Sequence, residues 1–116
     1  MYIVYGIPNC NSVKKARTWL EEHQISYQFH DYKKSGISKA KLTQWCRQLG
    51  WENLLNKKGT TWRGLDEAVQ QSITNQAAAI GLMMENNSVI KRPVIEKDDK
   101  IVVVRFDEEQ YAKLVQ

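Results

Sequence analysis

The stretch MYIVYGIPNCNSVKKARTWL at residues 1–20 changes its hydrophobic periodicity part-way along. Residues 2–5 are β-branched or aromatic and stop at a Gly-Ile-Pro turn, a pattern typical of a short buried strand. Beyond the turn, the apolar residues Val13, Ala16 and Leu20 fall on one face of a helix. The stretch therefore predicts a strand, a turn and a helix, and it places the first cysteine of the chain at the start of that helix.

The chain then continues to alternate between strand and helix patterns. The opening helix is expected to end near His23, and residues 25–30 alternate as a second strand. Strand, helix and strand joined by such short connections form a β-α-β unit with parallel strands. A middle helix is expected to begin after Ser38, a good N-cap, and to end at Gly50.

The second half of the chain predicts short helices and a hairpin. Residues 53–67 carry the glycines and threonines of a loop. Two short helices are expected at about residues 66–71 and 74–86. A β-hairpin is expected at residues 94–104 with its turn at 97–100, and Asp107 is placed to cap a closing helix. Three residues of that helix are expected to face inward: Tyr111, Leu114 and Val115.

The order of these elements decides the fold class. It runs β-α-β, then a helical segment, then β-β-α, which is the thioredoxin-like order with extra helices between the halves. We therefore expect an α/β fold with a mixed four-stranded sheet. At 116 residues the chain suits one domain, spanning residues 1–116 with the helical insertion at about residues 38–90.

Composition excludes some function classes and leaves others open. The formal net charge is +4, from 17 Lys and Arg against 13 Asp and Glu. This charge is spread along the chain, which fits either a solvated basic surface or an anion-binding site. Two cysteines and no hydrophobic leader indicate a cytoplasmic protein, and no apolar run approaches the roughly 20 residues of a membrane span.

Cys10 is the first candidate for chemistry. A thiol at a helix start faces unpaired backbone N–H groups and the positive end of the helix dipole, and both favour the reactive thiolate. Asn11 and Ser12 could support the thiolate through hydrogen bonds. The alternative is a cysteine that acts as a small buried apolar residue. Val13 occupies the position that a C-x-x-C motif would fill with a second cysteine.

The other cysteine has a different setting. Cys46 lies at helical spacing from Leu42, Trp45 and Leu49, which favours a packed, inert thiol over a resolving cysteine. The two cysteines and two histidines have no metal-ligand spacing, so no metal site is expected.

Two arginines are candidates beside a site. Arg92 precedes Pro93 at the start of the hairpin, where it offers a planar fork to an anionic group, although a plain surface arginine is the alternative. Arg105 follows the second hairpin strand and fits either an edge position or a site. Trp62, in the predicted loop, could line a cleft.

Four separated motifs carry a resemblance that covers nearly the whole chain. They are GIPNCNSVKKAR, LLNKKGTTWR, IKRPVI and VVVRFDEEQY, in that order. Together they resemble the arsenate reductase-like (ArsC/Spx) family, and most of all its small bacterial YffB-type members. The resemblance implies a thioredoxin-like fold with a helical insertion.

The resemblance also implies roles for individual residues. Cys10 matches the family's nucleophile, Arg92 and Pro93 match its arginine and typically cis proline, and Arg105 matches a second arginine. In arsenate reductases three arginines hold the arsenic oxyanion, and glutathione with glutaredoxin completes the reduction. The third arginine belongs to an L-L-R-K motif that here reads LLNK, so its position is Asn56, followed by Lys57. Losing that guanidinium weakens the expectation of arsenate as substrate.

Three functions follow from this resemblance as expectations. The first is a glutathione-dependent thiol–disulfide reductase, in which Asn11, Ser12, Arg92, Pro93 and Arg105 would bind glutathione or substrate, with Asn56 and Lys57 as further candidates. The second is an arsenate reductase coupled to glutathione and glutaredoxin. The third is a regulator that binds RNA polymerase, like Spx. We expect no bound cofactor, glutathione as co-substrate, an oxidised thiol or oxyanion as substrate, no nucleic-acid or membrane partner, and a monomer.

Overall fold

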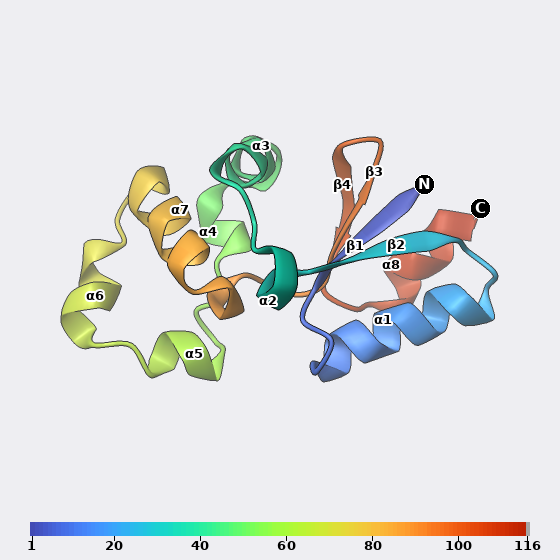
Figure 1. Ribbon diagram of the computed structural model, residues 1–116, viewed down its shortest axis with the longest axis horizontal. Coiled ribbons are helices and arrows are strands. Elements are labelled where there is room, and N and C mark those ends of the chain that lie inside the picture. The colour runs from blue at the N-terminus through green and yellow to red at the C-terminus, as the bar shows by residue number, and fades with distance from the viewer. Residues whose placement is uncertain (116) are drawn as a thin grey trace. The chain divides into compact units, whose positions relative to one another are not determined.

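The computed structural model describes residues 1–115. The chain folds into two compact units. The first unit comprises Met1–Ser35 and Arg92–Gln116, and the second comprises Gly36–Lys91. Figure 1 follows the chain from the strands of the first unit through the helices of the second and back. Among residues 1–115, no helix combines the length and apolar character that crossing a bilayer requires.

A four-stranded mixed sheet organises the first unit. Its strands are β1 (Tyr2–Gly6), β2 (Tyr27–Asp31), β3 (Val94–Lys97) and β4 (Lys100–Val104), in the spatial order β2-β1-β3-β4. β1 pairs with β2 in parallel and with β3 antiparallel, and β3 pairs antiparallel with β4. The predicted α/β fold with its β-α-β unit and hairpin is confirmed.

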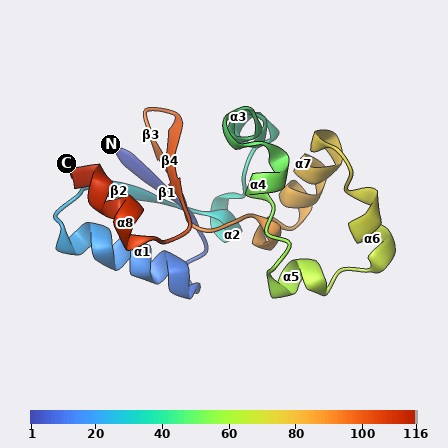
Figure 2. The ribbon, with the colours of Figure 1, turned by 180° about the vertical axis from the view of Figure 1, so that it is seen from behind.

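Two helices and one face of this sheet form the apolar core of the first unit. Helix α1 (Asn11–Glu22) connects β1 to β2, and α8 (Glu108–Ala112) follows β4. Figures 1 and 2 both show the two helices near one another. The buried core residues come from both helices and three strands: Val4, Ala16, Leu20, Ile95, Val103 and Tyr111. The helical spacing of positions 16 and 20 therefore buries α1 against the sheet, as predicted.

Gly6 allows the close approach between the end of β1 and the first turn of α1. A Cβ atom at this position would lie 2.7 Å from Cγ2 of Val13, far inside ordinary van der Waals contact. Val13 is fully buried, so it has little room to move. The absence of a side chain at Gly6 thus fixes where the N-terminus of α1 sits relative to the strand.

The second unit is helical. Its elements are α3 (Lys39–Leu49), α4 (Trp51–Leu54), α5 (Thr60–Arg63), α6 (Glu67–Ser72), α7 (Gln76–Glu85) and the 3-10 helix η1 (Asn87–Val89). The Ser38 hydroxyl accepts a hydrogen bond from the backbone N–H of Lys41 at 3.1 Å, and Gly50 ends α3 with φ of 86°. Both predicted caps of the middle helix are confirmed, as are the two short helices that became α6 and α7.

Three local expectations were wrong. Residues 53–67 are not simply a loop, because α4 ends and α5 forms within them, and Leu55 makes an isolated antiparallel bridge with Ile90. Burial of Leu54 and Trp62 holds these short helical turns despite the glycines nearby. Trp62, only 8% exposed, is a core residue rather than a cleft residue. Val115 is 52% exposed, because the chain leaves α8 as the 3-10 helix η2 (Lys113–Val115).

Candidate active site

The backbone around Cys10 matches the predicted strand, turn and helix start. Cys10 is the N-cap of α1, with extended backbone angles (φ −140°, ψ 127°), and its carbonyl accepts the first helical hydrogen bond from the N–H of Lys14 at 2.9 Å. Its side chain is partly exposed. The thiol therefore sits beside the free N–H groups of a 12-residue helix and remains accessible to a substrate.

The surroundings of Cys10 shift its thiol toward the thiolate. Partial burial acts to raise the pKa, but the backbone N–H of Val13, the guanidinium of Arg92 and the backbone N–H of Ser12 outweigh it, and the pKa of Cys10 is lowered. A thiol with a lowered pKa is ionised to a greater extent at neutral pH, and the thiolate is the nucleophilic form. The helix start and one arginine thus produce an activated thiol.

The sheet brings Arg92 to Cys10 across a long sequence separation. Tyr5 is paired with Val94 in the antiparallel β1–β3 ladder, so the residues after β1 run beside the residues before β3. Arg92 stabilises the Cys10 thiolate by both a hydrogen bond and its charge. The Arg92–Pro93 peptide bond is cis. Two predicted site residues, Cys10 and Arg92, are therefore close enough for the guanidinium to act on the thiol.

Arg105 joins this region through its backbone. Its N–H donates to the carbonyl of Pro93 at 2.7 Å, and its own carbonyl accepts a hydrogen bond from the Tyr111 hydroxyl at 2.7 Å. These two contacts hold Arg105 in the left-handed region, with φ of 68°, which a residue with a side chain rarely adopts. The arginine side chain is exposed. Arg105 and Pro93 are therefore adjacent, and the contacts that join them are backbone contacts.

The other predicted residues of the helix start differ in their contribution. Ser12 acts on the thiol through its backbone N–H. Asn11 is the first residue of α1 and has an exposed side chain. Lys14 and Lys15 are exposed on the same helix. The positive environment of Cys10 thus comes mainly from backbone N–H groups and Arg92.

Asn56 and Lys57 lie in the second unit, where local contacts hold both residues. The backbone N–H of Asn56 donates to the carbonyl of Val89 at 2.7 Å, and its side-chain nitrogen lies 2.7 Å from where a Cβ of Gly59 would stand. The ammonium of Lys57 lies over the rings of Trp51 and Trp62, at 5.8 and 5.4 Å from their centroids. Cation–π contacts of this kind compete with any anion for the lysine charge.

Cys46 has the opposite character to Cys10. It is 5% exposed on α3, beside the fully buried Leu42 and Trp45. Burial and the charge of Glu52 raise the pKa of Cys46. A buried thiol with a raised pKa is a poor nucleophile, which agrees with the packed thiol that the helical spacing indicates.

A buried polar cluster lies on the other face of the sheet and was not predicted from the sequence. The Tyr5 hydroxyl donates a 2.8 Å hydrogen bond to Oε1 of Glu96, which is 1% exposed. The ring of Tyr5 lies 4.8 Å from that of His30 and 6.5 Å from that of Tyr32. A signal did exist, because Val94 and Glu96 share one face of β3 and an acidic residue beside an inward valine is unusual.

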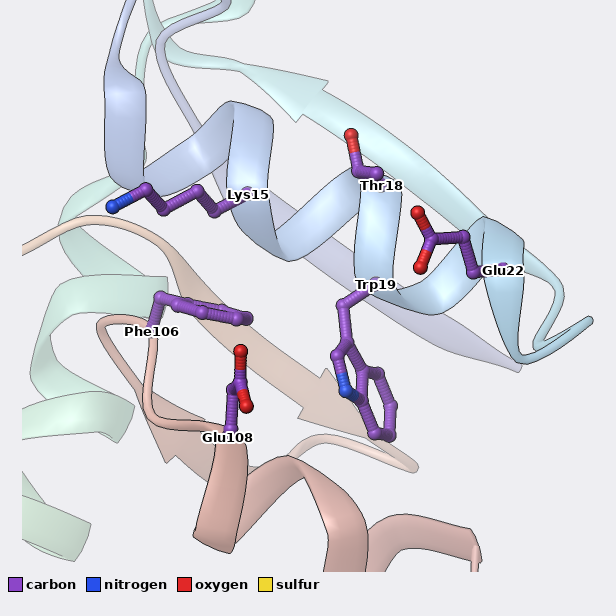
Figure 3. A pocket seen from close by; sticks show the side chains of 6 residues that line it. All are labelled: Lys15, Thr18, Trp19, Glu22, Phe106 and Glu108. Atoms are coloured by element: carbon purple, nitrogen blue, oxygen red, sulfur yellow. The ribbon is translucent and has the colours of Figure 1, made fainter.

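A surface hollow of the first unit is separate from these groups. It has a volume of about 270 Å³ and lies between α1 and the segment that leads into α8 (Figure 3). Its lining consists of Lys15, Thr18, Trp19, Glu22, Phe106 and Glu108. This lining includes neither the thiol nor Arg92, so the hollow supplies no reactive group. Among residues 1–115, no cluster of three His, Cys, Asp or Glu side chains could hold a metal ion.

Comparison with known proteins places this geometry in a family. The model of the ArsC family matches residues 5–114. An uncharacterised protein of Haemophilus influenzae is 45% identical over 111 residues, which cover 96% of each chain. The global transcriptional regulator Spx of Streptococcus mutans is 28% identical over 95% of this chain and 80% of its own length.

Solved structures agree with the sequence comparison. A YFFB protein is 46% identical, covers 100% of both chains and superposes with a TM-score of 0.92. An arsenate reductase (ArsC) related protein from Brucella melitensis is 44% identical over 99% of this chain and 94% of its own, with a TM-score of 0.78. The resemblance that the four motifs carried is thereby confirmed, and the chain belongs to the ArsC family.

Proposed function

We propose that this protein is a thiol–disulfide reductase that acts through the Cys10 thiolate and is regenerated by glutathione. The observation that carries the proposal is the thiol at the start of α1, with its pKa lowered by two backbone N–H groups and Arg92. Membership of the ArsC family and the likeness to an arsenate reductase-related structure support a reductase role.

The reaction needs one nucleophilic sulfur in the protein. The Cys10 thiolate attacks one sulfur of a substrate disulfide, a new disulfide bond forms to Cys10, and the second substrate sulfur leaves as a thiolate that takes a proton from water. A glutathione thiolate then attacks the substrate-derived sulfur of the mixed disulfide. This step releases a glutathione-containing disulfide and restores the Cys10 thiolate.

An external thiol fits the cysteine content of the chain. Val13, fully buried, stands where a C-x-x-C motif would supply a resolving cysteine. Cys46 is buried and its pKa is raised, so it is a poor candidate for attack on a mixed disulfide at Cys10. Arg92 beside the sulfur suits a substrate with carboxylates near its thiol, and glutathione has two.

The test compares two cysteine variants. NADPH oxidation is measured with glutathione, glutathione reductase and bis(2-hydroxyethyl) disulfide, for wild type, Cys10→Ser and Cys46→Ala. We expect Cys10→Ser to fall to the protein-free rate and Cys46→Ala to stay close to wild type, and mass spectrometry should find a 2-hydroxyethylthio adduct on Cys10 when bis(2-hydroxyethyl) disulfide is added without glutathione. Full activity in Cys10→Ser would refute the proposal.

Arsenate reduction is the second candidate, favoured by the arsenate reductase-related structure that is 44% identical. Asn56 stands where the L-L-R-K motif of arsenate reductases has an arginine that binds the oxyanion. The ammonium of the neighbouring Lys57 lies over the rings of Trp51 and Trp62. A missing charge-assisted contact weakens anion binding by about 1.5–3 kcal/mol, or roughly ten- to a hundredfold. Asn56→Arg should then raise arsenate-dependent glutathione oxidation, with Asn53→Arg as a surface control. Absence of arsenate turnover in wild type and Asn56→Arg would exclude this candidate.

The Spx relatives, 28% identical over most of the chain, suggest a regulator as a third candidate. Such a protein would bind RNA polymerase and need no reducible substrate. Stoichiometric recovery of polymerase subunits with the Cys10→Ser variant would support that function, whereas recovery at background level would exclude it.

A further inference from the structure

The surface hollow beside α1 has aromatic walls that the core holds in place. The ring of Trp19 meets that of Tyr111 edge-on at 5.4 Å between centroids, and the ring of Phe106 meets Tyr111 at 4.9 Å. Tyr111 is fully buried, and its hydroxyl donates to the carbonyl of Arg105 at 2.7 Å. Trp19 and Phe106 are half-buried, so both present part of their surface to the hollow. The walls are therefore formed before any ligand arrives.

The charges around the hollow favour a cation. Its lining carries two exposed carboxylates, Glu22 and Glu108, and one exposed ammonium, that of Lys15. Figure 3 shows the Glu108 carboxylate turned toward the space between the two rings, whereas the Lys15 ammonium points away from Trp19, toward the first turn of α1. Aromatic faces and carboxylates together suit a guanidinium, which is planar, stacks on rings and pairs with carboxylates.

A second place on α1 shows what such a set of groups holds. The guanidinium of Arg17 lies 4.2 Å from the ring centroid of Phe29 and 5.9 Å from that of Tyr27. Its Nε donates to the Tyr27 hydroxyl at 3.0 Å, and that hydroxyl donates to Glu21 at 2.9 Å. Two aromatic rings and a glutamate accommodate one arginine there. The hollow offers two rings and two glutamates, and its lining, among residues 1–115, includes no arginine.

The hollow lies within reach of a polypeptide whose sulfur is at Cys10. Trp19 stands nine positions after Cys10 on the same helix, or roughly 13 Å along the axis at about 1.5 Å per residue. An extended chain spans that distance in about four residues. The opposite wall also starts beside the thiol region, because Phe106 follows Arg105, whose N–H donates to the carbonyl of Pro93 at 2.7 Å.

We propose that this hollow is a substrate-recognition site that binds an arginine side chain of a polypeptide disulfide, about four residues from the sulfur that Cys10 attacks. The inference rests on the proposed function in taking Cys10 as the nucleophile, and it adds a polypeptide as the class of substrate. The guanidinium stacks against the rings of Trp19 and Phe106. The carboxylates of Glu108 and Glu22 pair with its charge.

The contacts are individually weak, so the expected effect is a preference among substrates. One exposed cation–π contact and one exposed ion pair together correspond to a preference of roughly fivefold for arginine over glutamine. The direction is informative, because long-range attraction by a chain of net charge +4 would favour an acidic peptide instead. A faster reaction of the basic peptide therefore reports the hollow and not the overall charge.

The experiment compares peptide substrates in the coupled NADPH assay, after subtraction of the protein-free rate. Each peptide carries one cysteine, as its mixed disulfide with 2-mercaptoethanol, and either arginine, glutamine or glutamate about four residues away on both sides. Cys10 attacks the peptide sulfur, the bond between the two substrate sulfurs breaks, and 2-mercaptoethanol leaves as a thiolate that takes a proton from water. We expect kcat/KM to be roughly fivefold higher for the arginine peptide than for the glutamine peptide, and lowest for the glutamate peptide.

Two variants of α8 separate the hollow from the overall charge. Glu108→Gln should lower the arginine preference by roughly twofold or more. Glu109→Gln removes the same charge from an exposed neighbour outside the lining, and it should leave the preference unchanged. Both variants should reduce bis(2-hydroxyethyl) disulfide at the wild-type rate. Equal kcat/KM for the arginine and glutamine peptides in wild type, or an arginine preference that Glu108→Gln leaves intact, would overturn the proposal.

A binding measurement separates this inference from the proposed function. The same peptides, with serine in place of cysteine, are titrated into isotopically labelled protein, and NMR follows the indole N–H signal of Trp19, assigned with Trp19→Phe. The arginine peptide should shift this signal and the glutamine peptide should not, even if the protein reduces no disulfide. Absence of a shift with the arginine peptide would overturn the recognition site, whereas absence of activity on bis(2-hydroxyethyl) disulfide would count against the proposed function alone.

Discussion

Replacing Gly6 with alanine is expected to destabilise the fold at the point where β1 meets the site helix. The new Cβ would lie 2.7 Å from Cγ2 and 3.5 Å from Cγ1 of Val13, whereas carbon atoms in contact prefer roughly 3.5–4.0 Å. Val13 is fully buried, so relief requires a shift of the first turn of α1. Such overpacking costs about 1–3 kcal/mol, or roughly 4–12 °C in Tm for a domain of this size.

The assay is thermal and urea unfolding, together with Cys10 alkylation, since the same turn carries the thiol. Gly81→Ala is a matched control, because nothing lies within 4 Å of its Cβ in α7, and it should stabilise by up to about 1 kcal/mol. Val13→Ala should reduce the additional cost of Gly6→Ala, because it removes both crowded methyl groups. If Gly6→Ala is as stable as wild type, the close approach does not fix the helix start.

Three further outcomes follow from single contacts. Ser38→Ala should lower the free energy of unfolding by about 1 kcal/mol, because the Ser38 hydroxyl caps α3. Ser35→Ala is the control, and equal stabilities of the two variants would show that the cap does not stabilise the fold. Lys57→Met should change the free energy of unfolding by less than about 1 kcal/mol, because cation–π contacts of an exposed lysine are weak. Urea unfolding measures this change, and a larger loss would show that Lys57 makes a further stabilising contact. Because the folded pKa of Cys10 is lowered, its ionisation adds stability that is fully present above the unfolded thiol pKa of about 8.5 and is lost as pH falls through the folded pKa. The stability of wild type relative to Cys10→Ser should therefore rise with pH across that window, and a flat difference would show that folding leaves the thiol pKa unchanged.

Local signals in the sequence were enough to predict most of the fold. The change from the period of a strand to that of a helix marked β1 and α1, and Ser38 and Gly50 marked the ends of α3. The hairpin followed from two apolar runs around a polar turn. These signals are readable because each lies within one element and its caps.

The elements that were missed depend on contacts outside themselves. α4 and α5 have four residues each, too few for a periodic pattern, and form because Leu54 and Trp62 are buried. α2 (Tyr32–Ser35), also four residues long, was not expected and carries the fully buried Tyr32. In such elements tertiary burial, rather than propensity, decides the local structure.

In the candidate site, too, local features could be predicted from the sequence and long-range contacts could not. The position of Cys10 at the helix start could be predicted, because the turn and the helix adjoin it in sequence. Its proximity to Arg92 rested on the family resemblance, since no local pattern reveals that the β1–β3 pairing joins residues about ninety positions apart. Glu96 was missed because its partner Tyr5 lies 91 positions away on another strand.

The pKa of the Cys10 thiol shows whether the start of α1 and Arg92 activate this cysteine. It is measured by the pH dependence of iodoacetamide alkylation in Cys46→Ala and, for comparison, in Cys46→Ala with Arg92→Gln. We expect a thiol pKa below the ordinary value of about 8.5 in the Cys46→Ala protein, and a higher pKa once Arg92 is replaced as well. An ordinary or raised pKa in both proteins would contradict an activated thiol at the start of α1.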